Sequence, residues 1–236
     1  MKKYISFACL VVLASVPPEL VGAEVESNEV RLFSDAAKAV HECSVLEKGV
    51  AYASKAEALC VKGPATYQLQ KDFDSRAENL SSAAMKVKLV VVDSDGGEMR
   101  PAIAIAHLIE RMGADVIVGR MCASSCAQFI FMAGRRKYVM EGGHVLFHGG
   151  PLSAAKIASL RLPHVVGESL MRQNKEFLDF YTERSISIDM LTKPPEEVQE
   201  RISAGEVVMW EWPRERLEEF GVGGLMYERD FMRKVE

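Results

Sequence analysis

Hydrophobic and polar positions follow regular patterns over the second half of the chain. Residues 87–92 (VKLVVV) are a run of mostly β-branched residues, which predicts a buried strand. The run ends in the turn-forming sequence DSDGG, and residues 98–112 then place apolar side chains at the spacing of an amphipathic helix. Residues 115–118 predict a second buried strand, followed by an apolar helix that ends near Ala133-Gly134.

Further elements follow at short intervals toward the C-terminus. The pattern predicts short strands over residues 137–140 and 144–148 and a long amphipathic helix over 164–184, with shorter helices over 196–203 and 213–220. The order of strand, glycine loop, helix, strand, serine pair, helix and strand pair is typical of an α/β fold with mostly parallel strands.

The pattern before residue 86 is weaker. Residues 30–33 predict a short strand, residues 36–47 have helical spacing, and residues 71–80 (KDFDSRAENL) predict a polar helix or a surface loop. We therefore divide the chain into a leader over 1–23, an N-terminal segment of unclear structure over 24–85 that packs on the core, and a main domain over 86–236.

The leader has its own pattern. Two lysines precede an apolar run, and small residues follow at Val21-Gly22-Ala23. This arrangement is typical of a secretory signal peptide cleaved near Ala23. The apolar run is shorter than the roughly 20 residues that span a bilayer, with an uncleaved signal anchor as the alternative. The sequence predicts an exported, soluble protein.

The cysteines agree with export. Removal of the leader takes away Cys9 and leaves an even set of four, which permits three connectivities. Proximity in the sequence favours Cys43–Cys60 and Cys122–Cys126, and the alternative is that some are buried thiols. Because no CxxC pair or histidine cluster accompanies them, we expect no metal site, and we expect no cofactor.

Composition excludes some function classes. The net charge is −4 with an ordinary balance of charged residues, which offers no support for binding to nucleic acid or to a lipid surface. The chain without its leader, about 210 residues, fits one domain with a substantial core.

Candidate chemistry lies where predicted strands give way to helices. Gly96-Gly97 and Ser124-Ser125 both occupy such places, where unpaired backbone N–H groups can stabilise an oxyanion. A serine needs a base, and His148 ends a predicted strand 23 residues after Ser125. Each feature alone is weak evidence, because glycine pairs commonly form turns and serines commonly cap helices.

Three segments in order, VVDSDGGEMRPAIAIAHLIE, DVIVGRMCASSCAQFIFMAG and HVLFHGG, resemble the ClpP/crotonase superfamily. They resemble in particular its ClpP-like serine peptidase branch, and are more similar still to the exported, ClpP-like proteins of bacterial periplasms. In that family an Ala-Gly pair follows the nucleophilic serine at eight and nine residues. Ala133 and Gly134 stand eight and nine residues after Ser125, so the resemblance implies that Ser125 is the nucleophile and Ser124 has a packing or capping role. The family's histidine corresponds to His148.

The resemblance implies a superhelix of ββα units with mostly parallel strands, usually assembled as trimers or larger rings. It also implies that the backbone N–H groups of Gly97 and Cys126 form the oxyanion hole. It covers residues 87–150 well and the C-terminal third loosely, and it does not explain residues 24–85. Two departures stand out: no aspartate occupies the family's position near residues 201–204, so the third triad member is unknown, and two cysteines bracket the serines.

The leading hypothesis is a periplasmic serine hydrolase, a peptidase acting on peptides or unfolded polypeptide segments, with Ser125 and His148 as its catalytic pair. The alternative is a non-catalytic binding or assembly module, which the missing aspartate favours. A crotonase-like acyl-thioester enzyme is a third reading, although coenzyme A is not expected in the periplasm. We expect a trimer-based homo-oligomer, no nucleic-acid partner, and no ATP-dependent unfoldase.

Overall fold

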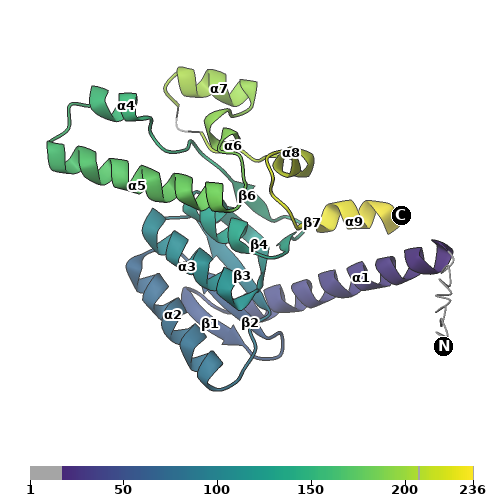
Figure 1. The fold of residues 1–236 in the computed structure, drawn as a ribbon. Coiled ribbons are helices and arrows are strands. Elements are labelled where there is room, and N and C mark those ends of the chain that lie inside the picture. The colour runs from purple at the N-terminus through teal and green to yellow at the C-terminus, as the bar shows by residue number, and fades with distance from the viewer. Residues whose placement is uncertain (1–17, 207, 236) are drawn as a thin grey trace, which may run out of the picture.

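The computed structural model describes residues 18–206 and 208–235, which form an α/β fold around a seven-stranded sheet (Figure 1). The strand order is β1-β2-β3-β4-β5-β7, and β6 pairs with β4. Only β1 and β2 pair antiparallel among the described strands, so the predicted α/β class with mostly parallel strands is confirmed. The strands are β1 (Gly49–Ala53), β2 (Ala58–Lys62), β3 (Leu89–Ser94), β4 (Asp115–Ala123), β5 (Lys137–Val139), β6 (His144–Leu146) and β7 (Leu225–Tyr227).

The helices connect these strands and extend the fold beyond the sheet. They are α1 (Pro18–Cys43), α2 (Tyr67–Ser82), α3 (Met99–Met112), α4 (Ala154–Ser159), α5 (His164–Glu183), α6 (Asp189–Thr192), α7 (Glu196–Ser203), α8 (Arg214–Glu219) and α9 (Glu228–Val235). A π-helix (η1, Cys126–Ile130) and a 3₁₀ turn (η2, Phe131–Ala133) take the place of the apolar helix predicted after β4. Within the described residues, no helix has the length and apolar character needed to cross a membrane.

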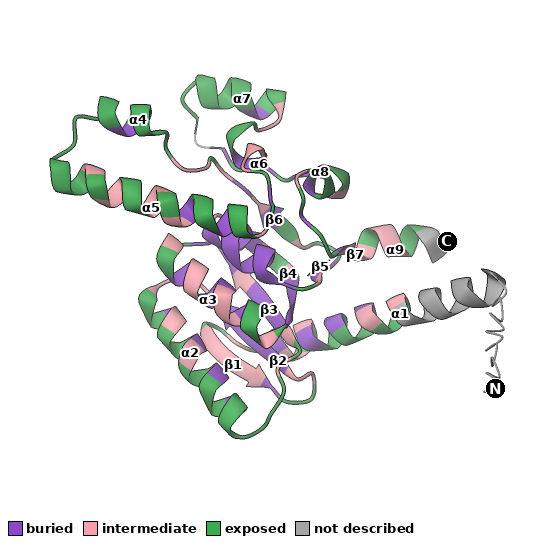
Figure 2. Cartoon of the chain, in the orientation of Figure 1, coloured by how far each residue is buried: buried purple, intermediate pink, exposed green. Residues whose placement is uncertain are grey.

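Hydrophobic clusters cover both faces of the sheet. Side chains alternate between the faces of a strand, and in β4 Val116 and Val118 join the cluster formed with α2, α3 and α5, while Ile117 joins the cluster formed with α1. Figure 2 shows buried residues concentrated in the central strands and on the helix faces turned toward them. This burial on both faces explains why β3 and β4 have continuous apolar sequences.

The N-terminal segment differs from its prediction. Residues 30–33 belong to α1 rather than to a strand, because Phe33, Ala36 and Ala39 continue one buried helical stripe. Phe33 packs edge-on against Tyr138 of β5, with ring centroids 5.6 Å apart. Strands β1 and β2 lie in the same sheet as the rest of the fold, and β2 pairs with β3. The predicted boundary between residues 85 and 86 therefore runs through one continuous sheet.

The predicted leader over 1–23 lies mostly outside the described residues, which begin with α1 at Pro18. The other end of α1 is tied to the sheet by a disulfide between Cys43 and Cys60 of β2, with Cα atoms 5.3 Å apart. This is one of the two pairings that sequence proximity favours.

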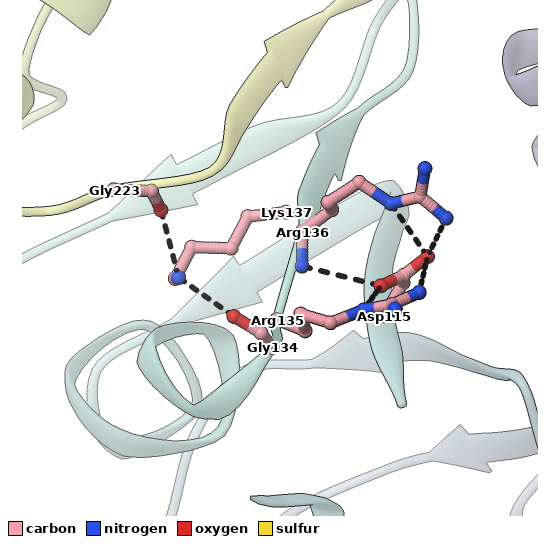
Figure 3. Close-up of polar contacts among 6 residues, drawn as sticks. All are labelled: Asp115, Gly134, Arg135, Arg136, Lys137 and Gly223. Atoms are coloured by element: carbon pink, nitrogen blue, oxygen red, sulfur yellow. Dashed lines mark hydrogen bonds and ion pairs between the residues drawn. The ribbon is translucent and has the colours of Figure 1, made fainter. Parts of the chain in front are cut away.

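Buried charges fix the starts of β4 and β5 (Figure 3). The Asp115 carboxylate accepts hydrogen bonds from Arg135 Nε at 3.1 Å and Arg136 Nη2 at 2.6 Å. The buried Lys137 Nζ donates to the carbonyls of Gly134 and Gly223, at 2.7 and 2.9 Å. Burial lowers the pKa of Lys137 to about 8. These contacts hold the N-terminal edge of the parallel strands, and the candidate site lies at the opposite, C-terminal edge.

Candidate active site

Strand β4 is long enough to support two neighbours in succession. Its first half pairs with β5, and its second half, Met121 to Ala123, pairs with β6. Ser124 follows directly, and its N–H donates to the carbonyl of Leu146 at 2.9 Å. Ser124 is therefore held beside the end of β6, the strand that leads to His148.

The chain turns sharply at Ser124. Its φ of 55° lies in the left-handed region, which is unusual for a residue with a Cβ. Ser125 has returned to right-handed geometry, with φ −61° and ψ −24°. A single left-handed residue thus converts the strand into the start of the helix. Strained turns of this kind occur at functional sites, where they project a side chain beyond the sheet.

His148 meets Ser124 at this turn. Its Nε2 lies 2.7 Å from the Ser124 Oγ, and its Nδ1 lies 3.0 Å from the carbonyl oxygen of Gly149. Because a carbonyl can only accept, Nδ1 must carry the proton, which leaves the Nε2 lone pair to accept from the serine hydroxyl. Next to His148, Phe147 exchanges backbone hydrogen bonds with Trp210 at 2.8 and 2.9 Å, which fixes the loop.

Ser125 is placed differently from the sequence prediction. Its side chain is buried, 3% exposed, and its Oγ has no hydrogen-bond partner among the described residues. The structure brings Ser124, and not Ser125, into contact with His148. The pairing of Ser125 with His148 expected from the sequence therefore has to be corrected by one residue.

The π-helix accounts for this shift of one residue. In η1 the N–H of Phe131 donates to the carbonyl of Cys126, five residues earlier, whereas an α-helix would use a spacing of four. A π turn contains one more residue than an α turn, so a count made back from Ala133-Gly134 through this turn moves by one residue, from Ser125 to Ser124. A signal in the sequence was available, because Ser124 stands midway between Cys122 and Cys126.

A disulfide joins Cys122 at the end of β4 to Cys126 at the start of η1, with Cα atoms 5.2 Å apart. It is the second pairing favoured by the sequence, and it links the two arms of the turn around Ser124. Both arms are buried, and both cysteines are fully inaccessible. The cross-link restricts the backbone conformations open to Ser124 in the folded and the unfolded chain.

The Gly96-Gly97 loop lies against the serine turn. A Cβ on Gly96, whose φ is +97°, would lie 2.5 Å from the Cβ of Ser124 and 3.0 Å from the nitrogen of Ser125. Only glycine permits this approach. The buried Ser94 holds the loop, since its Oγ accepts from the Gly96 N–H at 3.1 Å.

Gly97 extends β3 by a parallel bridge to Ala65 on the β2 side. In this bridge the N–H of Ala65 donates to the carbonyl of Gly96 at 2.6 Å, and the N–H of Glu98 donates to the carbonyl of Ala65 at 2.7 Å. The N–H of Gly97 itself takes no part in these two bonds. The sequence prediction used the N–H of the residue after the nucleophile, which is Cys126 if the nucleophile is Ser125. For Ser124, the serine that contacts His148, the next residue is Ser125.

No carboxylate contacts His148 among the residues that the structure describes. Two carboxylates near the family's expected position have other partners: Asp189 pairs with Lys193 at 2.9 Å, and Glu206 pairs with Arg201 at 2.8 Å. Burial lowers the pKa of His148 below its ordinary value, and the hydrogen bond to Gly149 offsets part of that effect. The imidazole is therefore neutral at pH 7, in the form that can accept a proton.

Comparisons with known proteins identify the family of the chain. A family model described as Clp protease matches residues 54–192 of the chain, including the part of the N-terminal segment that forms β2 and α2. Solved structures are also similar; one is a ClpP1 mutant from Listeria monocytogenes that is 14% identical, with 75% of this chain and 94% of that chain covered at a TM-score of 0.47. No curated protein has a significant sequence match.

Proposed function

Because the chain belongs to the Clp protease family, we propose that it is a peptidase-like serine hydrolase with Ser124 as nucleophile and His148 as general base. The family's description as Clp protease supports a peptidase activity for this chain. One observation carries the residue assignment: a serine in a left-handed turn places its Oγ 2.7 Å from a neutral imidazole nitrogen.

The chemistry follows from this contact. His148 Nε2 takes the hydroxyl proton as Ser124 Oγ attacks the carbonyl carbon of a peptide bond. The imidazolium then gives that proton to the leaving amine nitrogen, and the C–N bond breaks to leave an acyl ester on Ser124. Water hydrolyses the ester by the same route: His148 takes a proton from the water and returns it to the Ser124 oxygen.

The negative charge of the tetrahedral intermediate needs two donors. The N–H groups of Gly97 and Ser125 suit this role, because the glycine loop packs against the Ser125 nitrogen and the Gly97 N–H is not used in the bridge to Ala65. This assignment keeps Gly97 from the sequence prediction. It replaces Cys126 with Ser125, because the proposed nucleophile changes from Ser125 to Ser124.

We assign the protein to an oxidising compartment, the periplasm, after export. Two disulfides in a chain with four cysteines beyond its leader support this location, since disulfides persist in oxidising compartments. A trimer-based homo-oligomer is part of the proposal. Exposed apolar side chains around α4 and α5, among them Leu160, Leu162 and Val165, support an association with further copies.

Turnover of a fluorescently labelled unfolded polypeptide tests the assignment. Ser124→Ala and His148→Ala should each lower kcat by roughly 1,000-fold or more, because either change removes the proton-transfer pair. Ser125→Ala should still turn over substrate, because it keeps the backbone N–H and loses only a buried, unpartnered hydroxyl. Loss of activity in Ser125→Ala with activity retained in Ser124→Ala would contradict the assignment.

A non-catalytic binding module is the second candidate, and the lack of a carboxylate beside His148 among the described residues favours it. It predicts that folded, oxidised protein binds unfolded peptides without cleaving them. A peptide-binding measurement beside the turnover assay separates the two functions.

A further inference from the structure

The orientation of His148 depends on a backbone carbonyl. Its Nδ1–H has the Gly149 carbonyl as its acceptor, at 3.0 Å. In serine hydrolases with a triad, a carboxylate on another element accepts this bond and fixes the ring. Here the acceptor belongs to the next residue of the same exposed loop, so it orients the ring only if something else holds the loop.

Gln128 of the π-helix holds that loop. Its side-chain Nε2 donates to the carbonyl of His148 at 3.1 Å and, more weakly, to that of Gly149 at 3.5 Å. Both neighbours are carbonyl oxygens, so the amide nitrogen must face them. Gln128 is only 3% exposed, so its amide reaches the loop from the protein interior.

The same residue also holds the serine. The backbone N–H of Gln128 donates to the carbonyl of Ser124 at 2.9 Å. Gln128 is therefore bonded to Ser124 through its main chain and to the His148 loop through its side chain. It links the two members of the pair through bonds that are independent of the Ser124–His148 contact itself.

Tyr181 supports Gln128 from α5. Its hydroxyl donates to the Gln128 carbonyl at 3.0 Å, and its ring stacks on Phe177 with centroids 5.2 Å apart. Tyr181 is fully buried, and desolvation raises its pKa, so the hydroxyl stays protonated and remains a donor. The support from Tyr181 therefore does not depend on a titration near neutral pH.

We propose that Gln128, supported by Tyr181, is the positioning residue that orients His148 toward Ser124 in place of a carboxylate. This inference rests on the proposed Ser124–His148 pair. Gln128 touches neither substrate nor the reacting atoms, and it acts by fixing the carbonyls around the imidazole. A carboxylate would also stabilise the imidazolium, which an amide cannot do, so the pair should be slower than a full triad.

The test compares Gln128→Met, Tyr181→Phe and Ile109→Val in the full-length, oxidised protein. Gln128→Met has nearly the same shape without the amide donor, and Tyr181→Phe removes only the supporting hydroxyl. Ile109 is a core residue of α3, and its variant controls for a general loss of stability. Misplacement by about 1 Å can cost about 100-fold, so we expect kcat to fall by roughly 10- to 100-fold in Gln128→Met with KM unchanged.

Tyr181→Phe should lower kcat by a smaller factor than Gln128→Met does, and Ile109→Val should leave kcat unchanged. A second readout does not need catalysis. ¹⁵N NMR should show the wild-type His148 as a single Nδ1–H tautomer and Gln128→Met as a mixture of tautomers.

The outcomes are distinct. A single Nδ1–H tautomer and wild-type kcat in folded Gln128→Met would overturn the positioning role. If Gln128→Met does not fold, a wild-type tautomer and wild-type kcat in Tyr181→Phe would overturn it. If the wild type has no activity while the tautomer changes as expected, the proposed function fails and Gln128 still orients His148.

Discussion

The left-handed turn at Ser124 predicts an unusual response to glycine. A φ of 55° costs a residue with a Cβ about 1–2 kcal/mol, a cost that glycine does not bear. Ser124→Gly and Ser124→Ala both remove the hydroxyl and lose the His148 contact equally. They differ only in the Cβ, so their difference in unfolding free energy reports the backbone conformation.

Two smaller effects oppose glycine at this position. Glycine loses about 0.5–1 kcal/mol more conformational free energy on folding than alanine does. The Ser124 Cβ also packs against Gly96, so its removal gives up some contact. The balance still favours glycine, and we expect Ser124→Gly to be more stable than Ser124→Ala by about 0.5–1 kcal/mol. For a chain of this size, each kcal/mol of unfolding free energy corresponds to a shift of roughly 2–4 °C in Tm.

Ser125 provides a matched control next to it. Its φ and ψ of −61° and −24° are right-handed, so here alanine should be more stable than glycine by about 0.5–1 kcal/mol. The assay is equilibrium denaturation of the four oxidised variants without reductant. The predicted result is a reversal of sign between neighbouring serines. Alanine more stable than glycine at both positions would refute a left-handed Ser124.

Three further predictions concern the site and its support. The general base works only when neutral, and burial lowers the pKa of His148. We therefore expect kcat/KM to fall with decreasing pH through an apparent pKa below 6.5 and to stay level above it. A fall of kcat/KM centred above pH 6.5 would argue against this. Gly96→Ala should lower the rate of acylation by about 100-fold or more, the effect of losing an oxyanion donor, because its Cβ would lie 2.5 Å from that of Ser124. Single-turnover kinetics would measure this rate, and a wild-type rate would contradict the prediction. Replacing Cys43 and Cys60 together by serine should lower the unfolding free energy by about 3 kcal/mol, given the 17-residue separation; denaturation with no shift in midpoint would show that the cross-link does not constrain the unfolded chain.

Much of the fold was predictable from local patterns. Strands β3 and β4 are buried on both faces and therefore read as apolar runs, and α3 shows the helical period clearly. Strands β1 and β2 (GVAYA and ALCVK) were not predictable, because each is only five residues long and takes its strand geometry from pairing with neighbouring strands.

The sequence prediction and the structure differ by one residue in which serine meets His148. The glycine loop, the serine pair and His148 lie together because each follows or extends a strand of the same sheet, at its C-terminal edge. The choice between Ser124 and Ser125 depends on a π turn, whose single extra residue leaves no periodic signature in a short apolar segment. The acceptor for Nδ1 was also hidden, because a backbone carbonyl belongs to every residue type and only tertiary contacts reveal its use.

Covalent labelling with a fluorophosphonate, followed by peptide mapping, tests the central claim most directly. The probe reacts with a serine hydroxyl that is both activated and reachable. Of the two neighbouring serines, Ser124 has its Oγ in contact with His148, while the Ser125 Oγ is buried. The folded, oxidised protein should carry the adduct on Ser124, and Ser124→Ala should remain unlabelled. An adduct on Ser125, or no adduct on protein that is folded and oxidised, would contradict the assignment of Ser124 as the nucleophile.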